Sequence, residues 1–211
     1  MGRTSLHTDE KLLKTGAALA RKKGLSGFTV RELCAKSKVN LGMFHYYFKT
    51  KERFDREVLR TLYGELMKDI SLDLSPAAAP RKNAERILKS IHTFARENRV
   101  LLSALAADVM SGDKRTLQFI VNNFTHHVSL LLGELRRAKL TPAAADMPVF
   151  NAAITLVLPV ALPQLLSGTL DRLGAHLLPA PARLAVGSVW AEENVNKRIR
   201  LLLDAVFGEE K

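Results

Sequence analysis

Apolar residues recur at every third or fourth position along most of this chain, which is the spacing of amphipathic helices. Alternation of β-branched and polar residues is nearly absent, and Gly and Pro fall between the periodic segments. The pattern predicts an all-α fold, with helices at 8–23, 30–36, 41–47, 51–70, 81–97, 99–110, 113–139, 147–167 and 190–207. Five Gly and Pro residues interrupt it between 168 and 189, where we expect a loop with at most one short helix.

Helix-capping signals are concentrated in the first quarter of the chain. Thr29-Val30-Arg31-Glu32 has the form of a capping box, in which Thr29 accepts from the Glu32 amide and Glu32 reaches back to Thr29. Thr8, Asn40 and Thr50 precede three other predicted helices and are good N-cap residues. Two short helices joined by a three- or four-residue turn, behind a supporting helix, indicate a helix-turn-helix.

The second helix of such a motif lies in the major groove of DNA. We expect Val39, Phe44 and Phe48 to anchor this helix to the supporting helix at 8–23. The remaining residues would then point outward: Asn40, Leu41, Gly42, Met43, His45, Tyr46 and Tyr47.

The predicted helices divide the chain into two domains. Residues 1–54 form a helix-turn-helix headpiece, and 55–211 form a larger helical bundle for ligand binding and dimerisation. The long helix at 51–70, about 30 Å at 1.5 Å per residue, joins them. The loop at 71–80 contains small residues and Pro and follows this helix.

Charge is distributed unevenly between the two parts. The net charge is +11, of which residues 1–60 carry +8, from 14 Lys or Arg and 6 Asp or Glu. This asymmetry indicates an anionic partner, either nucleic acid or an acidic membrane surface, although a merely soluble basic surface would look the same. Composition alone does not distinguish between these interpretations.

The other compositional signals favour a cytoplasmic protein without a membrane span. Cys34 is the single cysteine, so no intrachain disulfide can form, and we expect it to be a small buried residue. The first 15 residues are too polar for a secretory signal. The apolar stretch at 149–166 contains polar and Pro residues and is shorter than the roughly 20 residues of a spanning helix, so we expect a buried helix.

Signatures of enzymes are missing from the sequence. It contains no Gly-rich phosphate loop, no metal-spaced His or Cys set and no nucleophile elbow. We therefore expect no catalysis, no cofactor and no metal.

The headpiece resembles the TetR family of regulators. The resemblance lies in Phe28-Thr29-Val30-Arg31-Glu32-Leu33 and in the run Val39-Asn40-Leu41-Gly42-Met43-Phe44-His45-Tyr46-Tyr47-Phe48-Lys49-Thr50-Lys51-Glu52. The family pattern has Thr-Val-Arg at the first site and ends in Tyr-Phe-x-x-Lys-Glu, and the match spans about residues 8–60. The chain departs from it at Asn40, Met43 and His45, where the family commonly has Ser or Thr, Thr again, and Tyr.

The resemblance implies specific roles for headpiece residues on double-stranded DNA. Phosphate contacts are implied for Thr29, Arg31, Lys38, His45, Tyr47 and Lys51, which are also sensible donors. Base contacts are hypotheses at the departing positions: Leu41 and Met43 toward thymine methyl groups, and Asn40 toward an adenine edge. His45 could be a pH-sensitive phosphate donor or simply an exposed polar residue, and Tyr46 could pack or point out.

The family also implies a homodimer whose C-terminal helices bind a small, often apolar ligand. Ligand binding would move the fourth helix and release the operator. Candidate pocket residues are His92, Met110, Phe119, Phe124 and His127, although core packing explains the same residue types. Candidate dimer residues are Val195, Ile199, Leu202 and Val206, a stripe that could instead face the chain's own core.

These observations predict a ligand-responsive repressor that binds a palindromic operator as a homodimer. The alternative is a basic architectural DNA-binding protein without small-molecule control.

Overall fold

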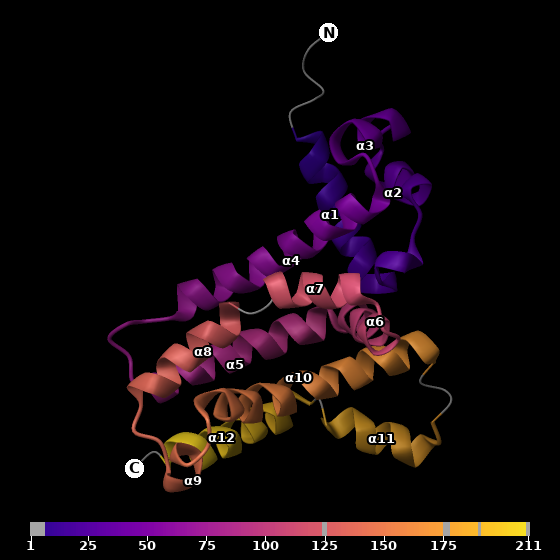
Figure 1. The fold of residues 1–211 in the computed structure, drawn as a ribbon. Coiled ribbons are helices and arrows are strands. Elements are labelled where there is room, and N and C mark those ends of the chain that lie inside the picture. The colour runs from indigo at the N-terminus through magenta and orange to yellow at the C-terminus, as the bar shows by residue number, and fades with distance from the viewer. Residues whose placement is uncertain (1–6, 124–125, 175–177, 190, 210–211) are drawn as a thin grey trace.

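The computed structural model describes residues 7–123, 126–174, 178–189 and 191–209, and these contain helices but no strand (Figure 1). The all-α prediction is confirmed. In chain order the helices are α1 (Thr8–Lys23), the 3₁₀ turn η1 (Leu25–Gly27), α2 (Val30–Ser37), α3 (Leu41–Phe48), α4 (Lys51–Asp73), α5 (Pro80–Glu97), α6 (Arg99–Met110), α7 (Lys114–Asn123), α8 (His126–Arg137), α9 (Pro142–Ala145), α10 (Val149–Leu173), α11 (Ala180–Val189) and α12 (Glu192–Phe207).

Local capping bonds fix the ends of the headpiece helices. The Thr29 hydroxyl accepts from the Glu32 amide at 3.1 Å, as expected for the first half of a capping box. The second half is replaced, because the Glu32 carboxylate pairs with Lys23 at 2.8 Å and Lys36 at 3.3 Å. The hydrogen bond from Lys23 lowers the pKa of Glu32. The expected cap at Thr8 is also wrong: His7 is the N-cap residue and makes no side-chain capping bond.

An aromatic core holds the headpiece helices together. Phe44 and Phe48 of α3 are buried and pack against Phe54 of α4, with ring centroids 5.4 and 4.9 Å from it. Val39 packs against the same core, so the expected anchoring of α3 is confirmed. Cys34 is buried there as well, and burial raises the pKa of its thiol.

The long helix α4 carries the headpiece away from the body (Figure 1). The body has its own core, formed mainly by α4, α5, α8, α10 and α12. The headpiece core nevertheless includes Leu101 and Leu105 of α6, so packing continues across the boundary expected at residue 54. At that joint α10 crosses α6 through Gly168, where a Cβ atom would collide with the Arg99 carbonyl.

The body helices differ from the expected ranges most clearly in two longer segments; in addition, α4 ends at Asp73 instead of residue 70, and the short helix α9 was not expected. The segment expected as one helix at 113–139 consists of α7 and α8, separated by residues 124 and 125, which lie outside the described residues. The helix expected to end at residue 167 continues to Leu173. Gly168 lies inside it because the close approach to α6 requires a residue without a side chain.

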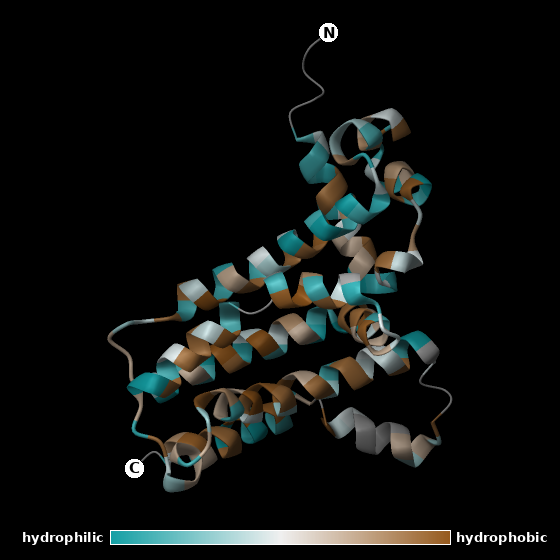
Figure 2. Cartoon of the chain, viewed as in Figure 1, coloured by the Kyte–Doolittle hydropathy of each residue, from teal (hydrophilic) through white to brown (hydrophobic). Residues whose placement is uncertain are grey.

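Helix α10 is only partly buried, in contrast to the buried helix expected from its composition. Hydrophobic residues follow it along its length (Figure 2). Among the described helices it alone is long and apolar enough to cross a membrane by length and composition, a test that soluble core helices also pass. Its inner face joins the body core through Ala152, Leu156 and Val160, whereas large apolar residues on its outer face are exposed.

Candidate nucleic-acid interface

Helix α3 lies at the end of the molecule farthest from the body (Figure 1). Because Phe44 and Phe48 point inward, residues about half a turn away point to solvent. Tyr46 is 69% exposed, and Gly42 lies on the same outer face. Leu41 is exposed at one flank, and Met43 and Tyr47 are partly buried at the other. The helix therefore presents a narrow surface that suits a groove about 12 Å wide.

Asn40 has a structural task at the start of α3. Its Oδ1 accepts from the Met43 amide at 2.8 Å and so caps the helix. A bidentate contact to adenine needs both the oxygen and the nitrogen of the amide. An amide oxygen has two lone pairs, so Oδ1 can cap the helix and still accept from an adenine amino group while Nδ2 donates to the same base.

The Lys51 ammonium makes most of its interactions inside the headpiece. Its ammonium donates to the Leu25 carbonyl at 2.9 Å and to Asp55 at 2.6 Å, and lies 4.1 Å from the centre of the Phe28 ring. Burial raises the pKa of Asp55, although Lys51 acts in the opposite direction. A phosphate contact by Lys51 would use the ammonium proton that these two acceptors leave.

The other residues expected at phosphates lie around α3 on the headpiece surface. Thr29, Arg31 and Lys38 are exposed, and Lys38 ends α2 with a φ of 52°. His45 is exposed, and its Nδ1 lies 3.2 Å from the Lys49 carbonyl. The structure thus brings the expected residues together on one end of the headpiece.

Sequence reasoning missed two exposed cations beside α3. Lys49 follows the helix directly, with its ammonium 5.9 Å from the Tyr46 ring centre, and Arg53 lies on the first turn of α4. The signal that could identify them is the basic run from Lys49 to Arg53, in which only Lys51 matches a family position for phosphate contact.

The described residues among the expected pocket set lie in different surroundings. Met110 is 89% exposed, because it lies at the end of α6 beyond the reach of either core. Phe119 packs against the headpiece core, whereas His92 is buried in α5 with no hydrogen-bond partner for Nδ1. Burial lowers the pKa of His92. Phe124 lies outside the described residues.

His127, the remaining pocket candidate, joins α8 to α4. The Tyr63 hydroxyl is hydrogen-bonded to His127 Nδ1 at 3.1 Å and accepts from the His127 amide at 3.3 Å. Burial, together with neighbouring His126, lowers the pKa of His127 to about 4. The imidazole in this joint is therefore neutral near pH 7.

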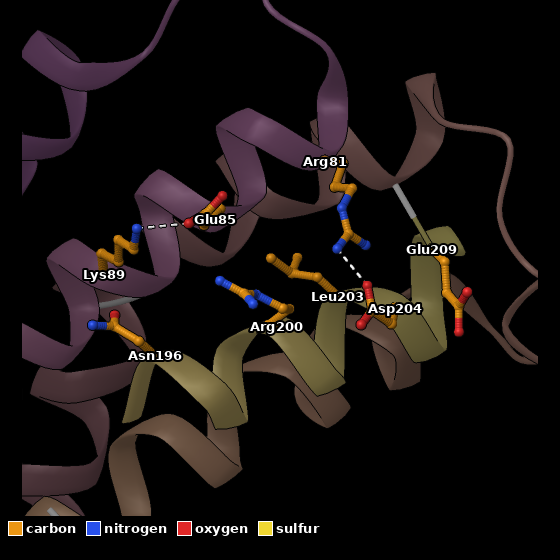
Figure 3. A pocket seen from close by; sticks show the side chains of 8 residues that line it. All are labelled: Arg81, Glu85, Lys89, Asn196, Arg200, Leu203, Asp204 and Glu209. Carbon is orange, nitrogen blue, oxygen red and sulfur yellow. Dashed lines mark hydrogen bonds and ion pairs between the residues drawn. The ribbon is translucent and has the colours of Figure 1, made fainter. Parts of the chain in front are cut away.

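A cleft of about 630 Å³ lies between α5 and α12 (Figure 3). Ion pairs cross or border it, Arg81 to Asp204 at 2.5 Å and Lys89 to Glu85 at 2.6 Å. Arg200 and Asn196 extend from α12 toward the same space. Such a charged lining does not suit an apolar ligand.

The stripe expected at the dimer interface faces the chain's own core. Val195, Ile199 and Val206 are buried against α5 and α10, and Leu202 packs partly against the same cluster. The physical reason is that α12 lies in the groove between these two helices and uses its apolar face to fill it. Five of the exposed large apolar residues lie instead on α10.

The headpiece geometry defines the class of helix-turn-helix DNA-binding proteins. Residues 12–57 match the family model described as bacterial regulatory proteins, tetR family. The solved structure of a TetR-family regulator from Rhodococcus sp. is similar over 94% of this chain and 98% of that one, with a TM-score of 0.72 and 14% identity. A TetR regulator from Haloarcula marismortui gives a TM-score of 0.71 at 14% identity, over 94% of this chain and 97% of that one. The headpiece is therefore that of the TetR family, and the chain as a whole shares the fold of TetR-family regulators.

One curated relative is similar in sequence. The HTH-type transcriptional repressor DhaR of Mycobacterium sp. (strain GP1) is 31% identical over 80 residues. This match covers 38% of the present chain and 39% of that repressor. The structural likenesses, all at low identity, concern the fold.

Proposed function

We propose that this protein is a cytoplasmic transcriptional repressor that binds a palindromic double-stranded operator as a homodimer under the control of a small molecule. The observation that carries the proposal is the exposed helix α3, capped by Asn40 and surrounded by cations at the basic end of the chain. A helix presented in this way fits the major groove, and Lys and Arg around it fit the phosphates.

Gly42 supports a close approach of DNA to the α3 backbone. A Cβ atom at this position would meet only the Asn40 oxygen, at 3.4 Å, which is an ordinary contact. Gly42 does not need a positive φ either. Since the free chain tolerates a side chain here, an external surface explains the glycine best.

A second copy of the chain is the occupant we propose for the outer face of α10. Five large apolar residues, each 37–56% exposed, recur there at every fourth position: Phe150, Ile154, Leu158, Leu162 and Leu166. A continuous apolar stripe of this kind marks an interaction site. Pairing about a two-fold axis would cover it and place two headpieces side by side, as a palindromic operator requires.

Control by a small molecule would act through α4, the helix that carries the headpiece. The Tyr63–His127 bonds tie α4 to α8, so a ligand that displaces α8 would also displace α4. The alternative, an architectural DNA-binding protein, needs the basic headpiece but no such coupling.

Selection of bound duplexes from a random DNA pool, followed by affinity measurements at two salt concentrations, tests the proposal. We expect a short palindrome bound with strong preference. Weak, sequence-blind binding with a steep salt dependence would support the architectural alternative. Loss of binding at every salt concentration would contradict both.

A further inference from the structure

The backbone turn directly after α3 is strained. Lys49 has φ 66° and ψ −57°, and the Thr50 amide donates to the Phe48 carbonyl at 2.7 Å. These values define the rare form of γ-turn, which is costly for a residue with a side chain. Bonds on both sides hold it, from the Lys49 amide to the His45 carbonyl at 3.2 Å and from the Arg53 amide to the Thr50 hydroxyl at 3.2 Å.

This turn directs the Lys49 carbonyl at the His45 ring. His45 Nδ1 lies 3.2 Å from that oxygen, and a carbonyl oxygen can only accept. Nδ1 therefore carries the proton of the neutral imidazole, and Nε2 is left as a bare acceptor. An edge contact with the Phe44 ring, centroids 5.4 Å apart, restrains the imidazole further.

His45 lies on the flank of α3 and not on its outermost line. It is about 100° from Tyr46 around the helix axis, on the side where α3 turns toward Lys49. When Tyr46 and Gly42 face the base edges, His45 faces the phosphate wall of the groove. A phosphate offers only acceptors, so neutral His45 cannot bind it, whereas the imidazolium can donate from Nε2.

The charged groups on the helices packed against α3 do not neutralise such an imidazolium. Among the described residues no carboxylate pairs with His45; Asp55 is paired with Lys51, and Glu32 with Lys23 and Lys36. The other charged groups on these elements are Asp9, Glu10, Lys11, Lys14, Arg21 and Lys22 of α1, Arg31 of α2, and Glu52, Arg53, Arg56, Glu57, Arg60, Glu65, Lys68, Asp69 and Asp73 of α4, with Lys38 and Lys49 directly after α2 and α3.

We propose that His45 is a proton-linked phosphate contact, so that operator binding takes up a proton and weakens as pH rises. This inference rests on the proposed DNA-binding function. A tyrosine at this position would donate its hydroxyl at any pH near neutrality, so the histidine makes this headpiece pH-sensitive.

Operator affinity measured from pH 6 to pH 8 at constant ionic strength tests the proposal. For the unchanged protein we expect affinity to fall by about fivefold or more over this range, since one linked proton changes affinity by at most about tenfold per pH unit. His45→Tyr should bind about equally at pH 6 and pH 8, and His45→Gln should also lose the pH dependence. Calorimetry in two buffers of different ionisation enthalpy should detect the proton uptake directly.

His7→Gln is the matched control, because His7 is the other described histidine of the headpiece and is exposed beside Glu10. This variant should keep the pH dependence of the unchanged protein. A pH profile that survives in His45→Gln, or a flat profile in the unchanged protein, would overturn the proposal. Absence of operator binding at every pH would instead contradict the proposed function, and circular dichroism would identify a variant that fails to fold.

Discussion

At the scale of single residues, a substitution at Gly42 should affect DNA binding without affecting the stability of the fold. We expect Gly42→Ala to leave the melting temperature unchanged or slightly higher, because Ala favours helices and meets no obstacle here. Operator affinity should fall at least tenfold, since the methyl group would separate the backbone from the DNA. Gly64→Ala is the control: it lies in α4 with nothing near its Cβ position and should bind the operator normally. Unchanged operator affinity in Gly42→Ala would contradict a close approach of the DNA to the α3 backbone.

Asn40 serves both the fold and the DNA, and two substitutions distinguish these uses. Asn40→Ala removes the cap of α3 and should cost about 1 kcal/mol in the free energy of unfolding. Asn40→Ser keeps an oxygen for the Met43 amide but loses the Nδ2 donor. It should therefore retain stability and change base preference at one operator position, as measured by selection from a random DNA pool. An unchanged binding profile for Asn40→Ser would limit Asn40 to capping.

At the scale of helices, the outer face of α10 predicts the oligomeric state. Leu158→Gln combined with Leu162→Gln should convert the proposed dimer to a monomer, because both side chains lie in the middle of the exposed stripe. Light scattering after size exclusion would measure the change, and affinity for a full operator should fall more than affinity for a half-site.

Leu72→Gln is the control for this change, since Leu72 is equally apolar and highly exposed but lies on α4, away from the stripe. The control protein should remain dimeric. A double variant that is also dimeric would place the interface elsewhere on the molecule.

At the scale of the whole molecule, the joint between α4 and α8 predicts how stability depends on pH. His127 has a pKa of about 4 in the folded chain, below the ordinary value of about 6.5, so the unfolded chain binds this proton first on acidification. The stability that the neutral His127 side chain gives the folded protein is fully present above pH 6.5 and is lost progressively as pH falls toward 4. The loss of stability reaches about 3 kcal/mol at pH 4.

Chemical denaturation of the unchanged protein and of His127→Gln at several pH values would measure this effect. The glutamine cannot titrate but can still meet the Tyr63 hydroxyl. We expect the stability difference between the two proteins to change in favour of His127→Gln below pH 6.5. A difference that is constant with pH would exclude His127 as its source.

The positions of the helices and the nature of the headpiece could be predicted from the sequence because their causes are local. Thr29 and Asn40 cap the helices that follow them, and the spacing of Phe44 and Phe48 puts both on one face of α3. These interactions join residues only three or four positions apart, so the spacing of residue types along the sequence is enough to predict them. The same locality underlies the resemblance of residues 8–60 to a known family.

The surroundings of each apolar face were decided only by the tertiary structure. The stripe of Val195 and Ile199 is as regular as the stripe of Leu158 and Leu162, yet the first fills the groove between two helices and the second is exposed. Likewise, the sequence predicts Lys51 as a free cation, whereas in the folded chain its ammonium is hydrogen-bonded to the Leu25 carbonyl. Periodicity determines which side of a helix is apolar, whereas the covering partner comes from distant parts of the chain, whose placement depends on the packing of the whole molecule.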